Sequence, residues 1–129
     1  MINKLYNKFK SRYPLKDNFK CDCYEWVYVI KNNDNGLTKI GITQDLPRRY
    51  NQLYNQSGCN LELLYAINPQ VSYDESAKVI EETMHDYYKK EREVGEWFKL
   101  SEDQLKEINE CIWEIEGEDV YDCQFNNYI

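Results

Sequence analysis

Three short features of the sequence carry side chains that core packing alone would not select. Lys39 lies inside an apolar stretch, and Gly41 interrupts the same stretch two residues later. Glycine within a strand often marks a close approach by a ligand or by backbone. An arginine pair, Arg48 and Arg49, follows soon after, and the acidic residue Glu81 comes later in the chain. Side chains of these types can hold a charged ligand, but their types alone do not indicate which one.

Glu81 belongs to a regular stripe on a predicted helix. Ala77, Glu81 and His85 follow one another at intervals of four residues, so they share one side of that helix beside its apolar face. A carboxylate in this place is expected to be either solvated or functional. With Tyr28 from an earlier apolar segment, the sequence offers a tyrosine, a lysine, an arginine and a carboxylate that could converge.

Each of these residues also has a plain structural explanation, which the sequence leaves open. Lys39 could extend its ammonium group to solvent from a strand edge, and the arginine pair could cover helix surface. Glu81 could pair locally with Lys78, and His85 could be a half-buried imidazole with satisfied hydrogen bonds. The choice depends on whether the surrounding elements bring these side chains together.

Hydrophobic patterning predicts a β-hairpin that would carry Tyr28, Lys39 and Gly41. Residues 26–30 are β-branched and aromatic, which is typical of a buried strand, and residues 37–43 predict the returning strand. The Asn-Asp-Asn-Gly segment between them is a strong turn signal.

Helices are predicted on either side of a third strand. Asp45 is placed to cap a helix that runs to about residue 56 and carries the arginine pair. Residues 61–67 predict the third strand, and a capping box formed by Ser72 and Glu75 opens the helix that carries Glu81.

Further elements are predicted at both ends of the chain. Residues 1–12 predict a short amphipathic helix, and residues 97–98 a short strand. A capping box of Ser101 and Gln104 opens a last helix, which Gly117 is expected to end. The fold class is therefore α+β: a small mixed or antiparallel sheet, made of the hairpin and the third strand and flanked by helices, with an extra N-terminal helix and an acidic C-terminal helix.

The order and spacing of four motifs resemble the GIY-YIG nuclease superfamily. In that family a hairpin carries two short motifs, the next helix carries an arginine, and a later helix carries a metal-binding glutamate. Tyr28 stands in the first motif, and Lys39 opens the second one in place of tyrosine, as in the phage-type branch. The resemblance covers residues 25–100. Val27-Tyr28 or Trp26-Val27-Tyr28 stands where the first family motif stands. The four other matching stretches are Lys39-Ile40-Gly41-Ile42-Thr43, Pro47-Arg48-Arg49, Ala77-x-x-Ile80-Glu81-x-x-Met84-His85 and Gly95-Glu96-Trp97-Phe98.

The resemblance implies a metal-dependent endonuclease of phage or viral type that hydrolyses phosphodiester bonds in DNA. Glu81 would hold one Mg²⁺ or Mn²⁺ ion, with waters completing an oxygen shell. Arg49 would contact the scissile phosphate through its guanidinium fork. Tyr28 would act as the general base or orient the water, and Lys39 could supply the charge that lowers its pKa from about 10.

Further site residues and departures from the family pattern also follow from the resemblance. The implied substrate or phosphate contacts are Gly41, Thr43, Arg48 and His85. Lys39 replaces the second tyrosine of the family, and Leu53 stands where many members have a histidine. A second interpretation is a catalytically weak or inactive module of the same fold that binds nucleic acid or a protein partner. A third is an unrelated α+β interaction protein.

Charge is distributed unevenly along the 129 residues. The net charge of −7 argues against a nucleic-acid partner for the chain as a whole, because a duplex is strongly negative. Residues 1–20, however, carry +5, and residues 101–129 carry −8. We expect a basic N-terminal arm or helix (1–24), a nuclease-like domain (25–100), and an acidic C-terminal helix and tail (101–129) packed on that domain. Such charge blocks are usually solvated surface, but the arm could touch phosphate and the tail could limit access to the cleft.

The expected partner is DNA, with RNA left open and with a protein partner or a homodimer as further expectations. No apolar run approaches the roughly 20 residues of a membrane span, and the N-terminus lacks the apolar core of a signal peptide. The five cysteines are irregularly spaced, which favours reduced thiols over a disulfide framework. Cys21 and Cys23 would need a second ligand pair to hold zinc. We therefore expect a cytoplasmic protein, in the host cytoplasm if it is viral.

Overall fold

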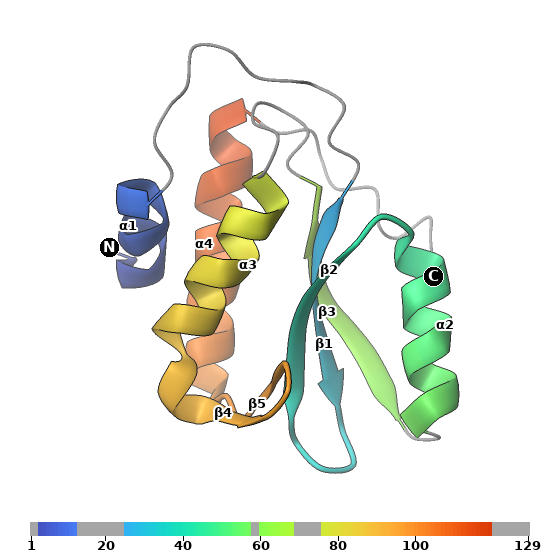
Figure 1. Ribbon diagram of the computed structural model, residues 1–129. Helices are drawn as coiled ribbons and strands as arrows, with labels where there is room; N and C mark the ends of the chain where they lie inside the picture. Colours follow the sequence, from blue (N-terminus) through green and yellow to red (C-terminus); the bar gives the residue numbers. More distant parts are fainter. Residues whose placement is uncertain (1–2, 13–24, 58–59, 69–75, 120–129) are drawn as a thin grey trace.

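The computed structural model describes residues 3–12, 25–57, 60–68 and 76–119 (Figure 1). All strand pairings in the five-stranded sheet are antiparallel, and the strand order is β3-β1-β2-β5-β4. The predicted α+β class, with helices flanking an antiparallel sheet, is confirmed. The elements are α1 (Lys4–Arg12), β1 (Trp26–Asn32), β2 (Thr38–Thr43), α2 (Leu46–Ser57), β3 (Leu61–Ile67), α3 (Ser76–Tyr87), the short 3₁₀ helix η1 (Lys89–Glu91), β4 (Arg92–Val94), β5 (Trp97–Phe98) and α4 (Glu102–Asp119).

The predicted hairpin forms and sets the register of the central strands. Tyr28 of β1 lies directly opposite Gly41 of β2, and Ile30 lies opposite Lys39. The turn places Gly36 at φ +77, a left-handed conformation that glycine adopts without steric cost. Because side chains alternate across a strand, this register puts Tyr28, Lys39 and Gly41 on one face of the sheet.

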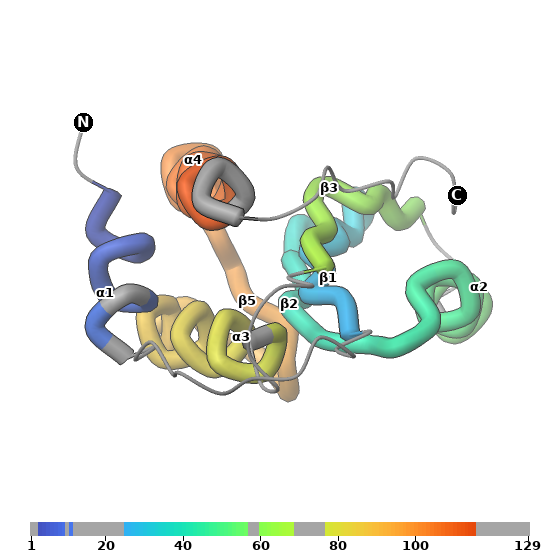
Figure 2. The backbone as a smooth tube through the Cα atoms, turned by 90° about the horizontal axis from the view of Figure 1, so that it is seen from above, coloured from blue at the N-terminus to red at the C-terminus, as the bar shows by residue number. Residues whose placement is uncertain are grey.

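The two faces of the sheet are covered by different helices (Figure 2). Helix α2 covers the face that bears Tyr28, where Trp26, Ile30, Leu46 and Leu53 are buried. Helices α1, α3 and α4 cover the other face. The core on that side contains Leu5, Phe9, Val27, Val29, Ile40, Ile80, Met84, Leu105, Ile108 and Ile112.

Helices α1 and α4, which precede and follow the strands in the sequence, pack into the same core as the sheet. Leu5 of α1 is completely buried, and Lys8 of the same helix pairs with Asp86 of α3 at 2.6 Å. Helix α4 opens with the predicted capping box, in which Ser101 Oγ accepts from the Gln104 amide (3.1 Å) and Gln104 Oε1 accepts from the Ser101 amide (2.9 Å). Both helices are therefore built into the same folded unit as the sheet.

The last helix is longer than predicted. It continues through Gly117 to Asp119 rather than ending at the glycine. Glycine costs a helix about 1 kcal/mol relative to alanine, but this cost by itself does not stop the hydrogen-bond ladder. Among the described residues, no helix is both long and apolar enough to cross a membrane.

The segment between α3 and α4 contains elements that the sequence did not predict. Helix η1 and strand β4 are only three residues long each, η1 has no buried residue, and all three β4 residues are exposed. Neither element therefore has the periodic apolar residues by which a helix or strand is predicted. Strand β4 exists because it pairs with β5, and Gly95 at φ +53 makes the turn between them. The Ser72 capping box, Cys21 and Cys23, and the arm and tail beyond residues 12 and 119 lie outside the described residues.

Candidate active site

Tyr28 and Gly41 form the centre of the site. The tyrosine ring lies over the glycine, and a Cβ atom at position 41 would be only 2.5 Å from Tyr28 Oη. Any other residue at this position would therefore displace the ring or the strand. Gly41 was predicted as a substrate contact, and in the structure its missing side chain makes room for Tyr28.

Arg49 reaches the hydroxyl of Tyr28 from helix α2. Its Nη1 atom donates to Tyr28 Oη at 3.5 Å. The start of the helix is fixed as predicted by Asp45, whose Oδ1 accepts from the Arg48 amide at 3.2 Å. Thr43 supports this cap, because its hydroxyl accepts from the Asp45 amide at 3.1 Å.

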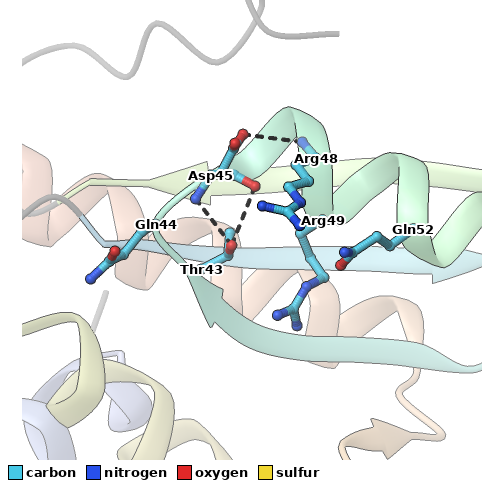
Figure 3. A pocket seen from close by; sticks show the side chains of 6 residues that line it. All are labelled: Thr43, Gln44, Asp45, Arg48, Arg49 and Gln52. Atoms are coloured by element: carbon cyan, nitrogen blue, oxygen red, sulfur yellow. Dashed lines mark hydrogen bonds between the residues drawn. The ribbon is translucent and has the colours of Figure 1, made fainter.

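A polar pocket of about 360 Å³ lies at the start of α2, and its lining includes Arg49, the hydrogen-bond partner of the buried Tyr28 (Figure 3). Both arginine side chains enter it, and the half-buried Arg49 lies deeper than the exposed Arg48. The free amide groups and dipole of a helix N-terminus also favour an anion here. The lining residues are Thr43, Gln44, Asp45, Arg48, Arg49 and Gln52.

Glu81 is a buried carboxylate on α3. The residue is only 8% exposed, and within the described parts of the chain no group donates a hydrogen bond to its carboxylate. Burial raises its pKa to about 7, and the negative charges of Glu96 and Glu82 act in the same direction, against a lowering effect of Lys39. Lys78 is exposed and makes no ion pair with Glu81, so the alternative of a local pair is not observed.

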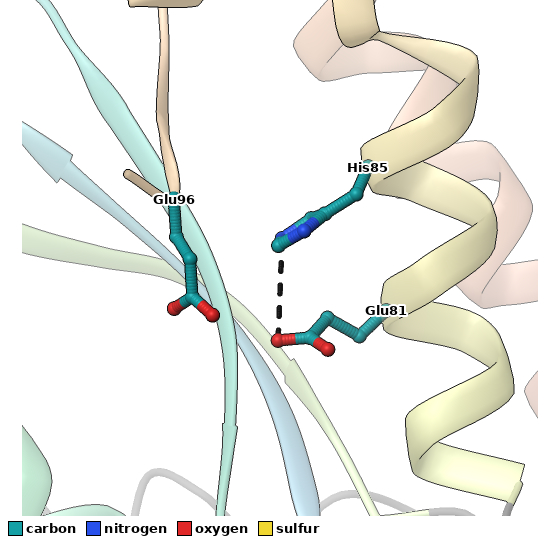
Figure 4. Close-up of side chains that lie close together, drawn as sticks. All are labelled: Glu81, His85 and Glu96. Carbon is teal, nitrogen blue, oxygen red and sulfur yellow. Dashed lines mark ion pairs between the residues drawn. The ribbon is translucent and has the colours of Figure 1, made fainter. Parts of the chain in front are cut away.

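A second carboxylate, that of Glu96, faces Glu81 from the turn between β4 and β5 (Figure 4). The backbone carbonyl of Glu96 accepts from the Ile40 amide at 3.2 Å, which anchors the turn to the edge of β2. Its side chain pairs with Lys39, with Nζ and Oε1 3.2 Å apart. One ligand atom from each of Glu81, Glu96 and His85 lies within 4.8 Å of the other two.

His85 uses both of its ring nitrogens within the protein. Nδ1 lies 3.1 Å from Arg92 Nη2, and Nε2 lies 2.8 Å from the Ile40 carbonyl oxygen. An arginine can only donate, so Nδ1 is the acceptor and the proton sits on Nε2, which donates to the carbonyl. With both nitrogens engaged, His85 has no lone pair to offer a metal in this arrangement. Its Nε2 lies 4.0 Å from Glu81 Oε2, too far for a hydrogen bond to that carboxylate.

The phenol of Tyr28 remains protonated in the free protein. Burial raises its pKa to about 12, and the charges of Glu96 and Glu81 add to this effect. Arg49 lowers the pKa through its charge and its hydrogen bond, but by less than burial raises it. The sequence had suggested Lys39 as the cation that acts on Tyr28. In the structure Arg49 occupies that role, and Lys39 pairs with Glu96.

The predicted residues thus gather around the edge of β2. This edge is open because β5 is only two residues long and pairs with β2 at Thr38 and Lys39 alone. Sequence reasoning did not assign a role to Glu96 or to Arg92. The signal for Glu96 is the Gly95-Glu96-Trp97-Phe98 motif, one of the stretches that match the family pattern. Nothing in the sequence marks Arg92, because its contact with His85 depends on how β4 folds back.

A comparison with protein families gave one match. The family model of the T5orf172 domain matches residues 25–113, which include every residue of this site and most of α4. No curated protein and no solved structure matches the chain.

Proposed function

The chain belongs to the T5orf172 domain family, a phage-associated domain of nuclease type, and on that premise we propose that it is a metal-dependent endonuclease that cuts DNA. The observation that carries the proposal is the position of the Tyr28 hydroxyl. It accepts a hydrogen bond from Arg49, which lines the polar pocket at the start of α2, and it is within electrostatic reach of the Glu81 and Glu96 carboxylates. We also propose, from the motif order, that the domain is of GIY-YIG type with lysine at position 39, and that it works in the cytoplasm.

The residues present fit a divalent cation. Carboxylate oxygens are the ligands that Mg²⁺ and Mn²⁺ prefer, and these ions keep several waters of their own. Glu81 would hold the cation, because its carboxylate is buried, lacks a hydrogen-bond donor among the described residues and faces a second carboxylate. When bound, the cation would supply positive charge next to the phosphoryl oxygens of the substrate.

The remaining side chains divide the work of phosphodiester hydrolysis. Arg49 binds the scissile phosphate through its fork of N–H donors, and Arg48 binds a neighbouring phosphate from the mouth of the pocket. Thr43 holds the start of α2 in place for both. Tyr28 is completely buried and holds the Arg49 guanidinium through its hydroxyl. A phenol with a pKa of about 12 is also a poor proton acceptor at neutral pH.

The test is cleavage of supercoiled plasmid DNA with Mg²⁺ or Mn²⁺ and with a chelator. We expect the wild-type protein to nick DNA only with metal, and Arg49→Ala and Glu81→Ala each to lose at least about 100-fold in rate, as loss of a transition-state contact typically does. Two control variants remove exposed charges outside the site: Lys90→Ala removes a positive charge, as Arg49→Ala does, and Glu93→Ala removes a negative charge, as Glu81→Ala does. Both controls should cut DNA at the wild-type rate. Full activity in both site variants would overturn the assignment.

A non-catalytic DNA-binding module is the second candidate. The observation in its favour is that Lys39 is held by Glu96 and Tyr28 stays protonated, so neither is free to take a proton from water. Binding of DNA that depends on Arg48 and Arg49, without turnover in Mg²⁺ or Mn²⁺, would select it.

A further inference from the structure

We propose that Glu96 is the second carboxylate of the cation site, and that Lys39 is its counter-ion while no cation is bound. The inference rests on the proposed function, because it assumes that Glu81 binds a divalent cation. It gives the Gly95-Glu96-Trp97-Phe98 motif a chemical role and explains why a lysine begins the Lys39-Ile40-Gly41 motif.

The position of Glu96 is built by the backbone. Gly95 adopts a left-handed conformation at φ +53, which turns the chain back from β4 toward β5. The Glu96 carbonyl then accepts from the Ile40 amide at 3.2 Å, just beyond the two positions at which β5 pairs with β2. The side chain is held at the open edge of the sheet, on the side from which Glu81 approaches.

Glu81 alone makes a poor cation site. Its neighbour His85 donates to Ile40 and accepts from Arg92, so the imidazole is not available as a ligand. Within the described part of the chain, the other oxygen ligand of the cluster is the carboxylate of Glu96, which lies within 4.8 Å of Glu81. Two facing carboxylates repel each other in a partly buried site, and a divalent cation between them would remove that repulsion.

Lys39 supplies the compensating charge in the free protein. Its side chain is only 13% exposed, and its ammonium lies 3.2 Å from Glu96 Oε1 and 5.5 Å from the centre of the Trp97 ring. A tyrosine at this position could not neutralise Glu96. The ammonium and a divalent cation would compete for the same carboxylate, so metal binding would free Lys39 to face the DNA phosphate.

Titration of Mn²⁺ into the metal-free full chain, followed by calorimetry, tests the role of Glu96 without relying on activity. We expect Glu96→Gln to weaken Mn²⁺ binding by at least about tenfold, the lower end of what loss of a supporting group costs a metal site. The matched control is Glu93→Gln, which changes an exposed acid in the middle of β4. It should bind Mn²⁺ as tightly as the wild type does.

Three outcomes of the titration are distinguishable. If wild-type protein does not bind Mn²⁺, the proposed metal-dependent function fails together with this inference. If Glu81→Gln abolishes binding while Glu96→Gln binds normally, the cation site stands and only the role of Glu96 is overturned. Weak binding by both variants supports the two-carboxylate site.

Lys39 gives a second measurement in which the expected change has the opposite sign. Lys39→Met should tighten Mn²⁺ binding, because the competing ammonium is removed. The gain should disappear when the same change is made in Glu96→Gln. An equal gain in both backgrounds would mean that Lys39 only repels the cation through space, and its role as counter-ion of Glu96 would be wrong.

Discussion

The carboxylate of Glu81 lies in surroundings that oppose its own charge. It is buried, it faces Glu96, and no described group donates a hydrogen bond to it. Folding therefore favours the protonated form, which is why its pKa rises from the usual value of 4.5 to about 7. A group of this kind destabilises the metal-free protein and becomes useful when a cation is bound.

This environment predicts a specific dependence of stability on pH. The folded state holds the Glu81 proton more tightly than the unfolded chain, so metal-free protein should lose stability as pH rises from 4.5 to about 7. Glu81→Gln removes that titration and should be the more stable protein at pH 8, by at most about 3.5 kcal/mol at roughly 1.4 kcal/mol per pKa unit.

Urea denaturation of both proteins between pH 4 and pH 8, in the presence of a chelator, measures the effect. The difference between the two free energies of unfolding isolates Glu81 from the other acidic groups. A difference that does not change with pH would contradict the assigned environment. Adding Mn²⁺ at pH 8 should stabilise the wild type and not the variant, since binding to the folded state alone raises its stability.

At the scale of elements, the site depends on short segments that end early. Strand β5 pairs with β2 at only two positions, which leaves the Ile40 backbone free for Glu96 and His85. Helix α2 begins directly after β2, so its first turn brings the arginine pair beside the hairpin residue Tyr28. The chemistry lies where the regular pairing of the sheet stops.

The N-cap of α2 gives a prediction at this scale. Asp45→Ala removes the acceptor of the Arg48 amide and should cost about 1 kcal/mol of stability. DNA binding should also weaken, because the first turn of α2, which carries both arginines, is no longer held by its N-cap. Asp45→Asn keeps an acceptor oxygen but removes a negative charge from the pocket. It should retain most of the stability and bind DNA more tightly.

Urea denaturation and fluorescence anisotropy with a labelled duplex, both without metal, separate the two effects. Equal losses of stability in Asp45→Ala and Asp45→Asn would show that the charge of Asp45 at the helix N-terminus matters more than the hydrogen bond. A loss of DNA affinity in Asp45→Asn would contradict the pocket as a phosphate site.

At the scale of the whole molecule, the net charge of −7 hides a basic site within an acidic chain. The last 29 residues carry −8, whereas Arg48 and Arg49 line one polar pocket at the start of α2. Helices α1 and α4 both contribute buried side chains to the core. DNA binding should therefore be weak and strongly dependent on salt.

The acidic end gives the corresponding prediction. Removing residues 118–129, which contain Glu118, Asp119 and Asp122, should raise DNA affinity at low salt, and the gain should shrink near physiological salt as charges are screened. Anisotropy titrations across a salt series measure both effects. A full-length variant with these three acids changed to amides is the control: it should reproduce the gain if charge is the cause. Unchanged binding in both proteins would count against a tail that limits access.

The sequence alone determined the fold class, the hairpin and the caps of α2 and α4, because these depend on local signals. Apolar alternation, the Asn33–Gly36 turn, Asp45 and the Ser101 box each act within a few residues. The same signals failed for β4 and for the end of α4, where pairing with β5 and continued helix propagation outweigh local preference.

Motif order also indicated that Tyr28, Arg49 and Glu81 belong together, but only the tertiary structure decided what each one contacts. Burial determines the pKa of Tyr28 and of Glu81, and burial is a property of the packed molecule. The partner of Lys39 proved to be Glu96, which is 57 residues away in the sequence. No local pattern encodes such a contact, because it arises only when a turn of the chain folds against the free edge of a distant strand.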